Sequence, residues 1–371
     1  MIFDFIKSLK DLIEFIKLDK NKKDYVIFSE SISYRYHFVD LILNLKKKGI
    51  ENIIIIVSDK RDEIFFNKLI KCYYIKNYLL LSLLFNTLEC KFMIMTLIDL
   101  GYHFQKSKNC QYYVYFFHGL ASTHQIYTKT AFKNYDIIFS NGSYQFNELR
   151  YAEEKFKFPK KNIINTGYFY LDYLSRTANL EKSKSRNILF APSWNYNKKN
   201  LFDDYAINLI KELLSNKFSV TFRPHPEHYK RSGKTIKKIK DLFINNLNFS
   251  FDYNVSNLDS LEKAKILITD NSAIVFEFLL IFKKPLIYIN YEDKIHNVER
   301  DRIPLKTIEE TFKEKFGNIL HVNNIDKLSS LCEELVDKNI SPSNIDMFKD
   351  KYISNVGKSA EYAANYLIKK S

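Results

Sequence analysis

The stretch from Lys265 to Asn290 constrains the fold of this chain more than any other segment. It contains a short apolar run, Ile266–Ile268, a polar loop, Asp270-Asn271-Ser272, an apolar helical run and a second strand-like run, Leu286–Ile289. A buried strand that ends in a polar loop, leads into a helix and is followed by another strand is typical of a βαβ unit. The segment therefore predicts parallel strands joined by a helix.

The loop Asp270-Asn271-Ser272 offers a hydroxyl and backbone N–H groups where a helix begins, which is a common position for bound phosphate. The helix then carries one charged residue, Glu277, within an otherwise apolar run from Ala273 to Phe282. A lone carboxylate in such a run needs a partner. A ligand hydroxyl and a group inside the protein are both open as that partner, and the loop is equally open as a plain helix cap.

The same alternation of apolar runs and helices extends over most of the 371 residues. The runs that predict strands are Tyr25–Phe28, Ile53–Val57, Phe92–Thr96, Tyr112–Phe117, Asp136–Phe139, Ile163–Thr166, Asn187–Phe190 and Phe218–Phe222. Buried runs of this kind predict parallel sheets covered on both faces. A polar stretch without periodicity, residues 175–186, predicts a linker, and a mostly helical tail follows from Ile325 to Lys370.

The expected architecture is α/β, with two Rossmann-like domains facing a central cleft, residues 1–182 and residues 183–371 with the helical tail. Residues 1–20 form an amphipathic helix, whose apolar positions include Ile2, Ile6, Leu9, Ile13 and Ile16. This helix is open to two interpretations, a helix lying on an anionic membrane and a helix packed on its own domain. The mixed charge of its polar face favours packing.

The formal net charge of +14 favours anionic partners, although the lysines are scattered over the sequence. Because they form no basic cluster interleaved with aromatic residues, we expect no nucleic acid partner. The four cysteines have no close or metal-type spacing and predict isolated thiols in a reducing compartment. No signal peptide or transmembrane-length apolar run stands out, so we expect a cytoplasmic protein, peripheral at the inner face of the plasma membrane.

Unusual residues follow the predicted strands, where α/β folds bind their ligands. His118-Gly119 follows Tyr112–Phe117; the histidine can serve as a general base, and the glycine permits close approach of backbone or ligand. The alternative for His118 is a hydrogen bond to its own turn.

Two further strand ends carry such residues. Arg223-Pro224-His225-Pro226 follows Phe218–Phe222, and its prolines stiffen a loop whose arginine suits phosphate. A turn whose arginine pairs with a surface acidic residue is the alternative. Ala191-Pro192-Ser193-Trp194 follows Asn187–Phe190 and includes the single tryptophan, which is open as a stacking wall or as domain-edge packing.

Common nucleotide and hydrolase signatures are absent from the sequence. There is no Walker loop, GxGxxG, HExxH or nucleophile elbow, which disfavours P-loop NTPases, typical dehydrogenases, zincins and α/β-hydrolases. No acidic metal cluster is evident, so we assign neither a metal nor a cofactor.

Taken in order, these motifs resemble the CDP-glycerol glycerophosphotransferase family, which includes teichoic acid primases and polymerases and related capsule enzymes. The matching pieces lie between about residues 110 and 290: His118-Gly119; Gly167 with Asp172; Phe190-Ala191-Pro192-Ser193-Trp194; Arg223-Pro224-His225-Pro226; Ile268-Thr269-Asp270-Asn271-Ser272; Phe276-Glu277; Lys284-Pro285. The sequence departs from the family's usual pattern at Ala273, at Glu277 and at Tyr168-Phe169-Tyr170.

The resemblance implies a GT-B-like fold with an acceptor domain first and a nucleotide-donor domain second. It implies transfer of a glycerol-phosphate or similar polyol-phosphate unit from CDP-glycerol or a similar CDP-polyol to a polysaccharide, teichoic-type or lipid-linked acceptor, with CMP leaving. By the same resemblance His118 is the base and His225 the second catalytic residue. The implied donor-binding residues are Gly119, Ser193, Arg223, Asp270, Asn271, Ser272 and Glu277.

Two alternatives stay open. A nucleotide-sugar glycosyltransferase or epimerase could use the same two-domain fold and the same Asp-x-Ser loop. A non-enzymatic basic protein that binds a membrane or nucleic acid would account for the net charge and the N-terminal helix.

Overall fold

The computed structural model describes residues 2–180, 186–195, 199–292, 294, 296–338 and 340–371. The chain divides into two compact units. The first contains Met1–Gly119, Tyr127–Tyr173 and Tyr352–Ser371, and the second contains Leu120–Ile126 and Leu174–Lys351. Part of the predicted linker, residues 181–185, lies outside the described residues.

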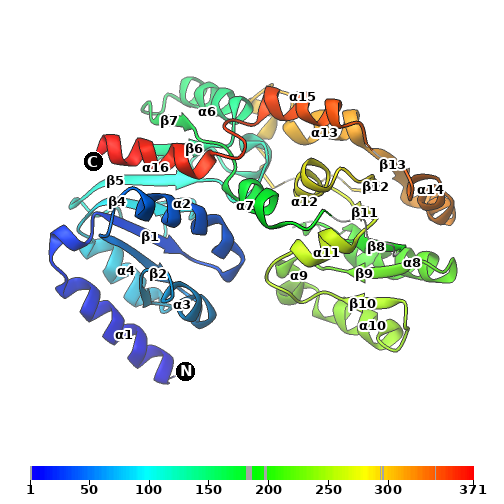
Figure 1. Ribbon diagram of the computed structural model, residues 1–371, viewed down its shortest axis with the longest axis horizontal. Coiled ribbons are helices and arrows are strands. Elements are labelled where there is room, and N and C mark those ends of the chain that lie inside the picture. Colours follow the sequence, from blue (N-terminus) through cyan, green and yellow to red (C-terminus); the bar gives the residue numbers. More distant parts are fainter. Residues whose placement is uncertain (1, 181–185, 196–198, 293, 295, 339) are drawn as a thin grey trace. The chain divides into compact units, whose positions relative to one another are not determined.

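The first unit contains a seven-stranded parallel sheet in the order β3-β2-β1-β4-β5-β6-β7 (Figure 1). This order matches the doubly wound Rossmann arrangement, in which the strand order reverses beside β1. The strands are β1 (Tyr25–Ser29), β2 (Ile53–Val57), β3 (Lys71–Tyr74), β4 (Cys90–Met95), β5 (Cys110–Phe116), β6 (Ile137–Ser140) and β7 (Asn162–Asn165).

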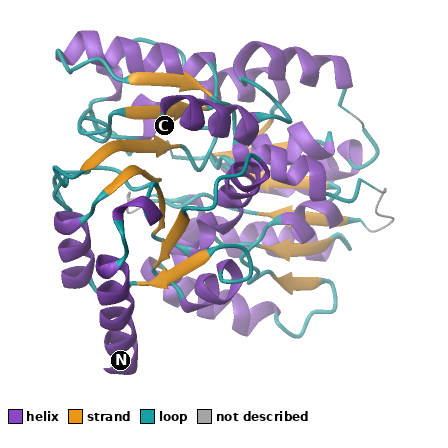
Figure 2. Cartoon of the chain, turned by 60° about the vertical axis from the view of Figure 1, so that its left-hand side comes forward, coloured by secondary structure: helices purple, strands orange, loops and turns teal. Residues whose placement is uncertain are grey.

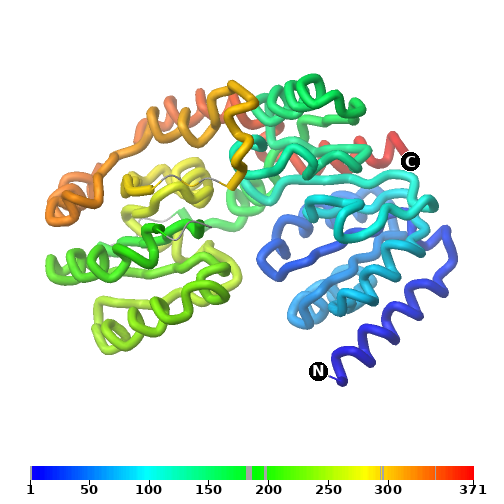
Figure 3. Tube along the Cα trace, turned by 180° about the vertical axis from the view of Figure 1, so that it is seen from behind, coloured from blue at the N-terminus to red at the C-terminus, as the bar shows by residue number. Residues whose placement is uncertain are grey.

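Successive side chains of these strands enter two different cores. Val26 and Phe28 of β1 pack on one face with side chains of α1 (Ile2–Lys17) and α4 (Tyr78–Thr87). Tyr25 and Ile27 pack on the other face with α2 (Arg35–Lys47) and α16 (Ser359–Lys370). Figure 2 shows helices against the strands, and Figure 3 shows α1 beside α4. Burial on both faces explains why these strands are continuous apolar runs.

The remaining helices of the first unit are α3 (Lys60–Phe66), α6 (Ser143–Phe156) and α7 (Phe169–Thr177), whose last turn enters the second unit. Cys90 and Cys110 lie opposite each other on β4 and β5, where the Cys90 thiol donates a hydrogen bond to the Cys110 sulfur at 3.4 Å and no disulfide joins them. The four cysteines are free thiols, as predicted, although strand register brings this pair together from positions that are distant in sequence.

The second unit contains a six-stranded parallel sheet in the order β10-β9-β8-β11-β12-β13. Its strands are β8 (Asn187–Phe190), β9 (Ser219–Phe222), β10 (Phe249–Phe251), β11 (Ile266–Thr269), β12 (Leu286–Asn290) and β13 (Asn318–His321). Its helices are α5 (Thr123–Ile126), α8 (Leu201–Ser215), α9 (Pro226–Arg231), α10 (Gly233–Phe243), α11 (Leu258–Lys263), α12 (Ile274–Glu277), α13 (Ile308–Phe316), α14 (Leu328–Leu335) and α15 (Pro342–Tyr352).

The βαβ segment predicted from Lys265 to Asn290 is confirmed by β11 and β12, which pair directly in parallel. The helix between them is less regular than expected. Only Ile274–Glu277 is α-helical, and a π-helical turn follows over Phe278–Phe282. Ala273 occupies the N-cap position and makes no side-chain cap hydrogen bond.

The observed division differs from the predicted domains at the C-terminus, because α16 belongs to the first unit and packs on α2 (Figure 1). Gly167 and Asp172, which follow β7, contact the segment that leads into α16. The Asp172 carboxylate accepts hydrogen bonds from the backbone N–H groups of Gly357 (2.6 Å) and Ser359 (2.7 Å). At Gly167, where φ is +100°, a Cβ would lie 2.2 Å from the Ser354 carbonyl oxygen. This close approach requires glycine.

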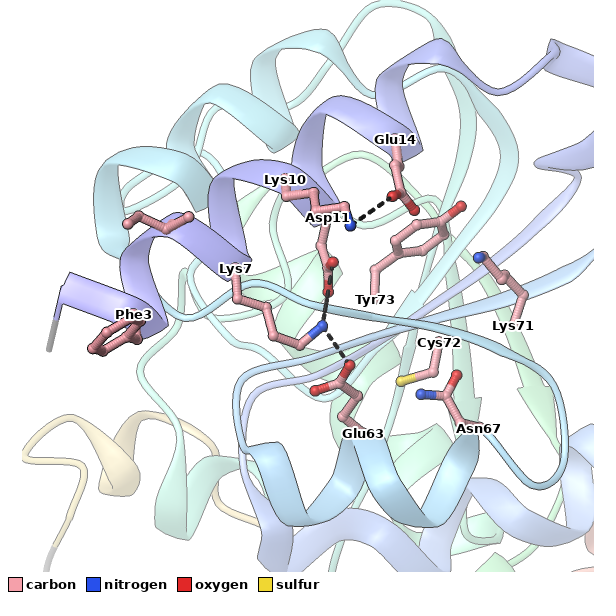
Figure 4. Close-up of a pocket in the computed structure, with 11 residues that line it drawn as sticks. Phe3, Lys7, Lys10, Asp11, Glu14, Glu63, Asn67, Lys71, Cys72 and Tyr73 are labelled. Carbon is pink, nitrogen blue, oxygen red and sulfur yellow. Dashed lines mark hydrogen bonds and ion pairs between the residues drawn. The ribbon is translucent and has the colours of Figure 1, made fainter.

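The N-terminal helix α1 lies along the edge strand β3 (Figure 4). The Asp11 carboxylate accepts a hydrogen bond from the backbone N–H of Tyr74 at 2.8 Å. Lys7 pairs with Asp11 at 3.1 Å and with Glu63 of α3 at 2.7 Å. An edge strand exposes unpaired backbone groups, and the Asp11 carboxylate satisfies one of them. The prediction that this helix packs on its own domain is confirmed.

We predict that Asp11→Ala lowers the free energy of unfolding by about 1–3 kcal/mol, because it leaves the Tyr74 N–H without its acceptor. Urea denaturation followed by circular dichroism measures the change. Glu14→Ala is the matched control, since Glu14 is half-exposed on the same helix and pairs loosely with Lys10 at 4.0 Å. Equal losses in the two variants would contradict a specific role for Asp11.

Candidate functional site

His118 follows β5 at the carboxyl edge of the first sheet and is held through its main chain. Its carbonyl oxygen accepts a hydrogen bond from Nε2 of His37 at 3.1 Å and another from the hydroxyl of Tyr168 at 3.2 Å. The Tyr34 ring lies against the His118 ring, with the two centroids 4.3 Å apart. The histidine is therefore partly buried and fixed by three neighbouring side chains.

Burial lowers the pKa of His118 to about 4. Its Nδ1 atom is buried and makes no hydrogen bond to another described residue. Burial also lowers the pKa of His37 to about 3, with the nearby His118 acting in the same direction. Both imidazoles are thus neutral near pH 7, and a neutral imidazole can accept a proton.

The sequence predicted that Gly119 permits close approach of backbone or ligand, and no such approach by atoms of the described residues is found at its Cα. Its carbonyl oxygen accepts a hydrogen bond from Asn141 Nδ2 at 2.8 Å. A Cβ at Gly119 would meet nothing within 4 Å. No neighbouring part of the described chain therefore requires glycine here, and close approach of a ligand stays a prediction.

Glu30, directly after β1, was missed in the sequence. Its Oε1 accepts a hydrogen bond from the Thr96 hydroxyl at 2.8 Å, while Oε2 is buried without a described partner. Burial raises the pKa of Glu30 to about 7. A carboxyl group that titrates near neutrality at the carboxyl ends of strands is a candidate for proton transfer. Its position after the predicted strand Tyr25–Phe28 was the available signal.

The second unit has a cavity of about 150 Å3 beside the loop that follows β11. Asn271 and Ser272, two of the predicted donor-binding residues, line it. The remaining lining residues come from α5, α12, β12, α13 and the loop before α13: Gln125, Ile126, Val275, Tyr288, Lys294, Arg300, Thr307, Glu309, Glu310 and Lys313. Cationic, hydroxyl and carboxylate groups therefore share one small space.

Lys294 is one of three cations that line this cavity, with Arg300 and Lys313, and the sequence pointed to none of them. Its main-chain carbonyl accepts a hydrogen bond from Gln125 Nε2 at 3.2 Å, but its ammonium makes no hydrogen bond or ion pair with another described residue. Burial lowers the pKa of Lys294, and the charges of Asp270 and Glu309 partly oppose this. An ammonium group without a hydrogen-bonded partner beside a cavity suits an anionic ligand.

Asp270 and Ser193, both predicted to bind the donor, bond to each other instead. The Asp270 carboxylate accepts from the Ser193 backbone N–H at 2.6 Å and from its hydroxyl at 2.8 Å. This pair joins the loops that follow β8 and β11, two neighbouring strands. Both residues therefore shape the loop that presents Asn271 and Ser272, and direct contact of Asp270 with a donor stays a prediction.

The guanidinium of Arg223 also has partners inside the protein. Its Nη1 pairs with the buried Asp252, and its Nη2 donates to the Val255 carbonyl at 3.3 Å. The sequence left open a pairing with a surface acid, whereas the acid that pairs with Arg223 is buried. Removing the arginine would leave a buried carboxylate without its cation, so Arg223→Ala is a poor probe of ligand binding.

His225 and Glu277 each have an intramolecular partner. His225 Nδ1 accepts from the backbone N–H of Glu227 at 3.2 Å and caps α9. In the neutral ring the proton is then on Nε2, which can donate to an anion. Glu277 is buried and accepts a hydrogen bond from Asn257 Nδ2 at 2.6 Å, so the expected partner of this carboxylate includes a group inside the protein.

No group of three or more metal-ligating side chains lies together among the residues that the structure describes. Within the same residues, no helix is both long and apolar enough to span a bilayer.

Two Rossmann-like parallel sheets in one chain define a GT-B-type fold. A structure titled wall teichoic acid polymerase TagF has a TM-score of 0.60 and 17% identity, with 100% of this chain and 98% of that chain covered. UDP-GlcNAc 2-epimerase from Neisseria meningitidis, bound to UDP-GlcNAc, has a TM-score of 0.61 and 15% identity, with coverage of 94% and 100%. The fold is therefore shared by enzymes of different chemistry.

The family model described as CDP-glycerol:poly(glycerophosphate) glycerophosphotransferase matches residues 18–369, and the chain belongs to this family of transferases. The minor teichoic acid biosynthesis protein GgaB of Bacillus subtilis (strain 168) is 26% identical over 271 residues. That alignment covers 66% of this chain and 27% of GgaB, so the chain spans about a quarter of this relative.

We predict that His118 makes stability depend on pH. Its pKa is about 4 in the folded protein, against an ordinary 6.5, so the unfolded chain binds more protons between these values. The stability from burying the neutral ring is complete above pH 6.5 and is lost as the pH falls towards 4. In His118→Asn, urea denaturation from pH 7 to 4.5 will show a shallower loss than in the parent protein.

His103→Asn, a change at an exposed histidine of the same unit, is the control and should follow the parent protein. Comparing variants removes the contribution of other titrating groups, including Glu30. Identical pH dependence of the parent protein and His118→Asn would contradict burial of a neutral His118.

Proposed function

We propose that this protein transfers a glycerol-phosphate unit from CDP-glycerol, or a related polyol-phosphate from a CDP-polyol, to a hydroxyl of a teichoic-type or polysaccharide acceptor and releases CMP. The observation that carries the proposal is the family match over residues 18–369, which extends through both Rossmann-like units. The histidine and cation arrangements support it, because phosphoryl transfer needs positioning and charge neutralisation more than covalent chemistry.

In the proposed reaction, His118 accepts the proton of the acceptor hydroxyl. The acceptor oxygen forms a bond to the phosphorus that carries glycerol, and the bond from that phosphorus to the bridging oxygen of the diphosphate breaks. The electron pair leaves with CMP. Because burial lowers the pKa of His118 to about 4, the ring is neutral at pH 7 and can accept the proton.

The cavity beside Ser272 is proposed to bind phosphate oxygens of the donor. Lys294 and Arg300 supply positive charge, and Ser272 supplies a hydroxyl donor. His225 would donate from Nε2 to another oxygen of the diphosphate, because its Nδ1 is occupied by the Glu227 N–H. The volume of about 150 Å3 suits a phosphate group rather than a whole nucleotide.

A nucleotide-sugar enzyme is the second candidate, since the Neisseria epimerase structure resembles this chain as closely as the TagF structure does. The fold cannot separate the two functions. The identity of the nucleotide does so directly, because the first predicts selective binding of CDP-glycerol and the second selective binding of a UDP-sugar.

We predict that calorimetry detects CDP-glycerol and CMP but not UDP-N-acetylglucosamine or UDP. Lys294→Gln should weaken CDP-glycerol binding by about tenfold or more, because it removes a charge-assisted contact with phosphate.

In assays of CMP release, His118→Ala and His225→Ala should lose activity while retaining the folded circular dichroism spectrum.

Lys306→Gln is the matched control, since Lys306 is half-exposed and forms a surface ion pair with Glu314 outside the lining of the cavity. Selective binding of UDP would transfer the protein to the nucleotide-sugar class. Full CMP release by His118→Ala would remove that residue from the mechanism.

We further propose that α1 attaches the protein to the inner, anionic face of the plasma membrane. The helix packs through Leu12 and Phe15, yet its opposite side is exposed, with Ile2 at 74% and Phe3 at 84% of full accessibility. Further exposed apolar residues extend this surface along α1 and onto α4: Phe5, Ile6, Leu9, Ile13, Ile16, Leu79 and Leu83. Exposed Lys10 and Lys20 supply charge that suits anionic lipid.

We predict that the protein co-sediments with vesicles that contain phosphatidylglycerol and binds less to vesicles of phosphatidylcholine alone. The double variant Phe3→Ser/Ile6→Ser should lose most of this binding, because it removes apolar surface that would enter the lipid. Leu247→Ser, at a fully exposed leucine of the second unit, is the control. Equal binding by the double variant and the parent protein would contradict attachment through α1.

A further inference from the structure

We propose that His37 and Tyr168 are positioning residues for His118, which they hold by its main-chain carbonyl rather than by its ring. This inference rests on the proposed function, in which His118 accepts the proton of the acceptor hydroxyl. No direct contact of His37 or Tyr168 with the reacting groups is needed, because both act through the carbonyl oxygen of His118.

The contacts converge on one oxygen atom. His37 Nε2 lies 3.1 Å and the Tyr168 hydroxyl 3.2 Å from the His118 carbonyl oxygen, and these two donor atoms are 3.5 Å from each other. A carbonyl oxygen has two lone pairs and can accept both bonds. Because a carbonyl only accepts, the neutral His37 ring must carry its proton on Nε2.

The two donors are themselves held in place. Tyr168 is 1% exposed and His37 5% exposed. The His37 ring stacks on the ring of Tyr170, with the centroids 4.6 Å apart. Tyr168 and Tyr170 lie two residues apart, so one short segment supplies both the hydroxyl bonded to the His118 carbonyl and the ring stacked on His37.

This arrangement differs from a catalytic triad. In a triad, a carboxylate bonds to Nδ1 of the histidine and fixes the orientation and tautomer of the ring. Here Nδ1 of His118 is buried without a described partner, and the Tyr34 ring covers one face of the imidazole. The direction of the ring is therefore set by the position of the backbone and by packing, which makes the carbonyl contacts important for catalysis.

The experiment compares Tyr168→Phe with Tyr113→Phe. Both changes remove one buried hydroxyl from the first unit, but the Tyr113 hydroxyl accepts from the Ser107 N–H at the opposite end of β5. We expect Tyr168→Phe to lower kcat for CMP release by about ten- to a hundredfold through misplacement of the base. The KM for CDP-glycerol should stay within about twofold, since donor binding does not use this residue. Tyr113→Phe should retain the parent kcat.

A second pair tests His37. His37→Gln retains an N–H donor and should keep more activity than His37→Ala. Imidazole signals of His118, recorded by NMR with labelled histidine, provide a readout independent of turnover and should change in Tyr168→Phe but not in Tyr113→Phe. Equal loss of kcat in the two tyrosine variants, or unchanged His118 signals in Tyr168→Phe, would overturn the inference. A parent protein that releases no CMP would refute the proposed function instead, and the NMR comparison would still decide the positioning role.

Discussion

Parallel strand pairing is the constraint on which the rest of this structure depends. Strands β1 to β7 and β8 to β13 form two sheets in which the described pairs are all parallel. Parallel strands require helical crossovers, and these helices cover both faces of each sheet. Polar chemistry is thereby confined to the loops at the strand ends. His118 and Glu30 in the first unit, and Ser193, Arg223 and Ser272 in the second, all follow the carboxyl ends of strands.

Burial then sets the charge of these groups. In the first unit, burial keeps the His118 ring neutral and raises the pKa of the Glu30 carboxyl to about 7. Two groups able to accept a proton therefore lie at the carboxyl ends of strands in this unit. In the second unit the ammonium of Lys294 lines a small cavity without a hydrogen-bonded partner among the described residues. Phosphoryl transfer requires a proton acceptor and positive charge that compensates the charge of the phosphate. The first unit offers groups of the first kind, and the second unit offers the second.

The sequence predicted the central strands and one edge strand, β7, and missed the other three edge strands. The missed strands, β3, β10 and β13, are all edge strands of three or four residues. An edge strand has a backbone partner on one side only and is less completely buried, so its apolar pattern is weaker. Lys71 of β3 and His321 of β13 are exposed, for example. The sequence identified Asp172 as part of a motif but did not predict its hydrogen bonds, because their donors, Gly357 and Ser359, are distant in the sequence.

The sequence by itself determined the α/β class, the family and the loops that carry the unusual residues, because buried apolar runs and the motifs that end them are local patterns. The tertiary structure decided what those residues contact. It paired Arg223 with Asp252 and Asp270 with Ser193, returned α16 to the first unit, and placed His37 and Tyr168 on the His118 carbonyl. These contacts depend on strand order and on the close approach of segments that are distant in the sequence. The packing of the whole unit sets the distances between such segments, and a local pattern of side chains does not encode them.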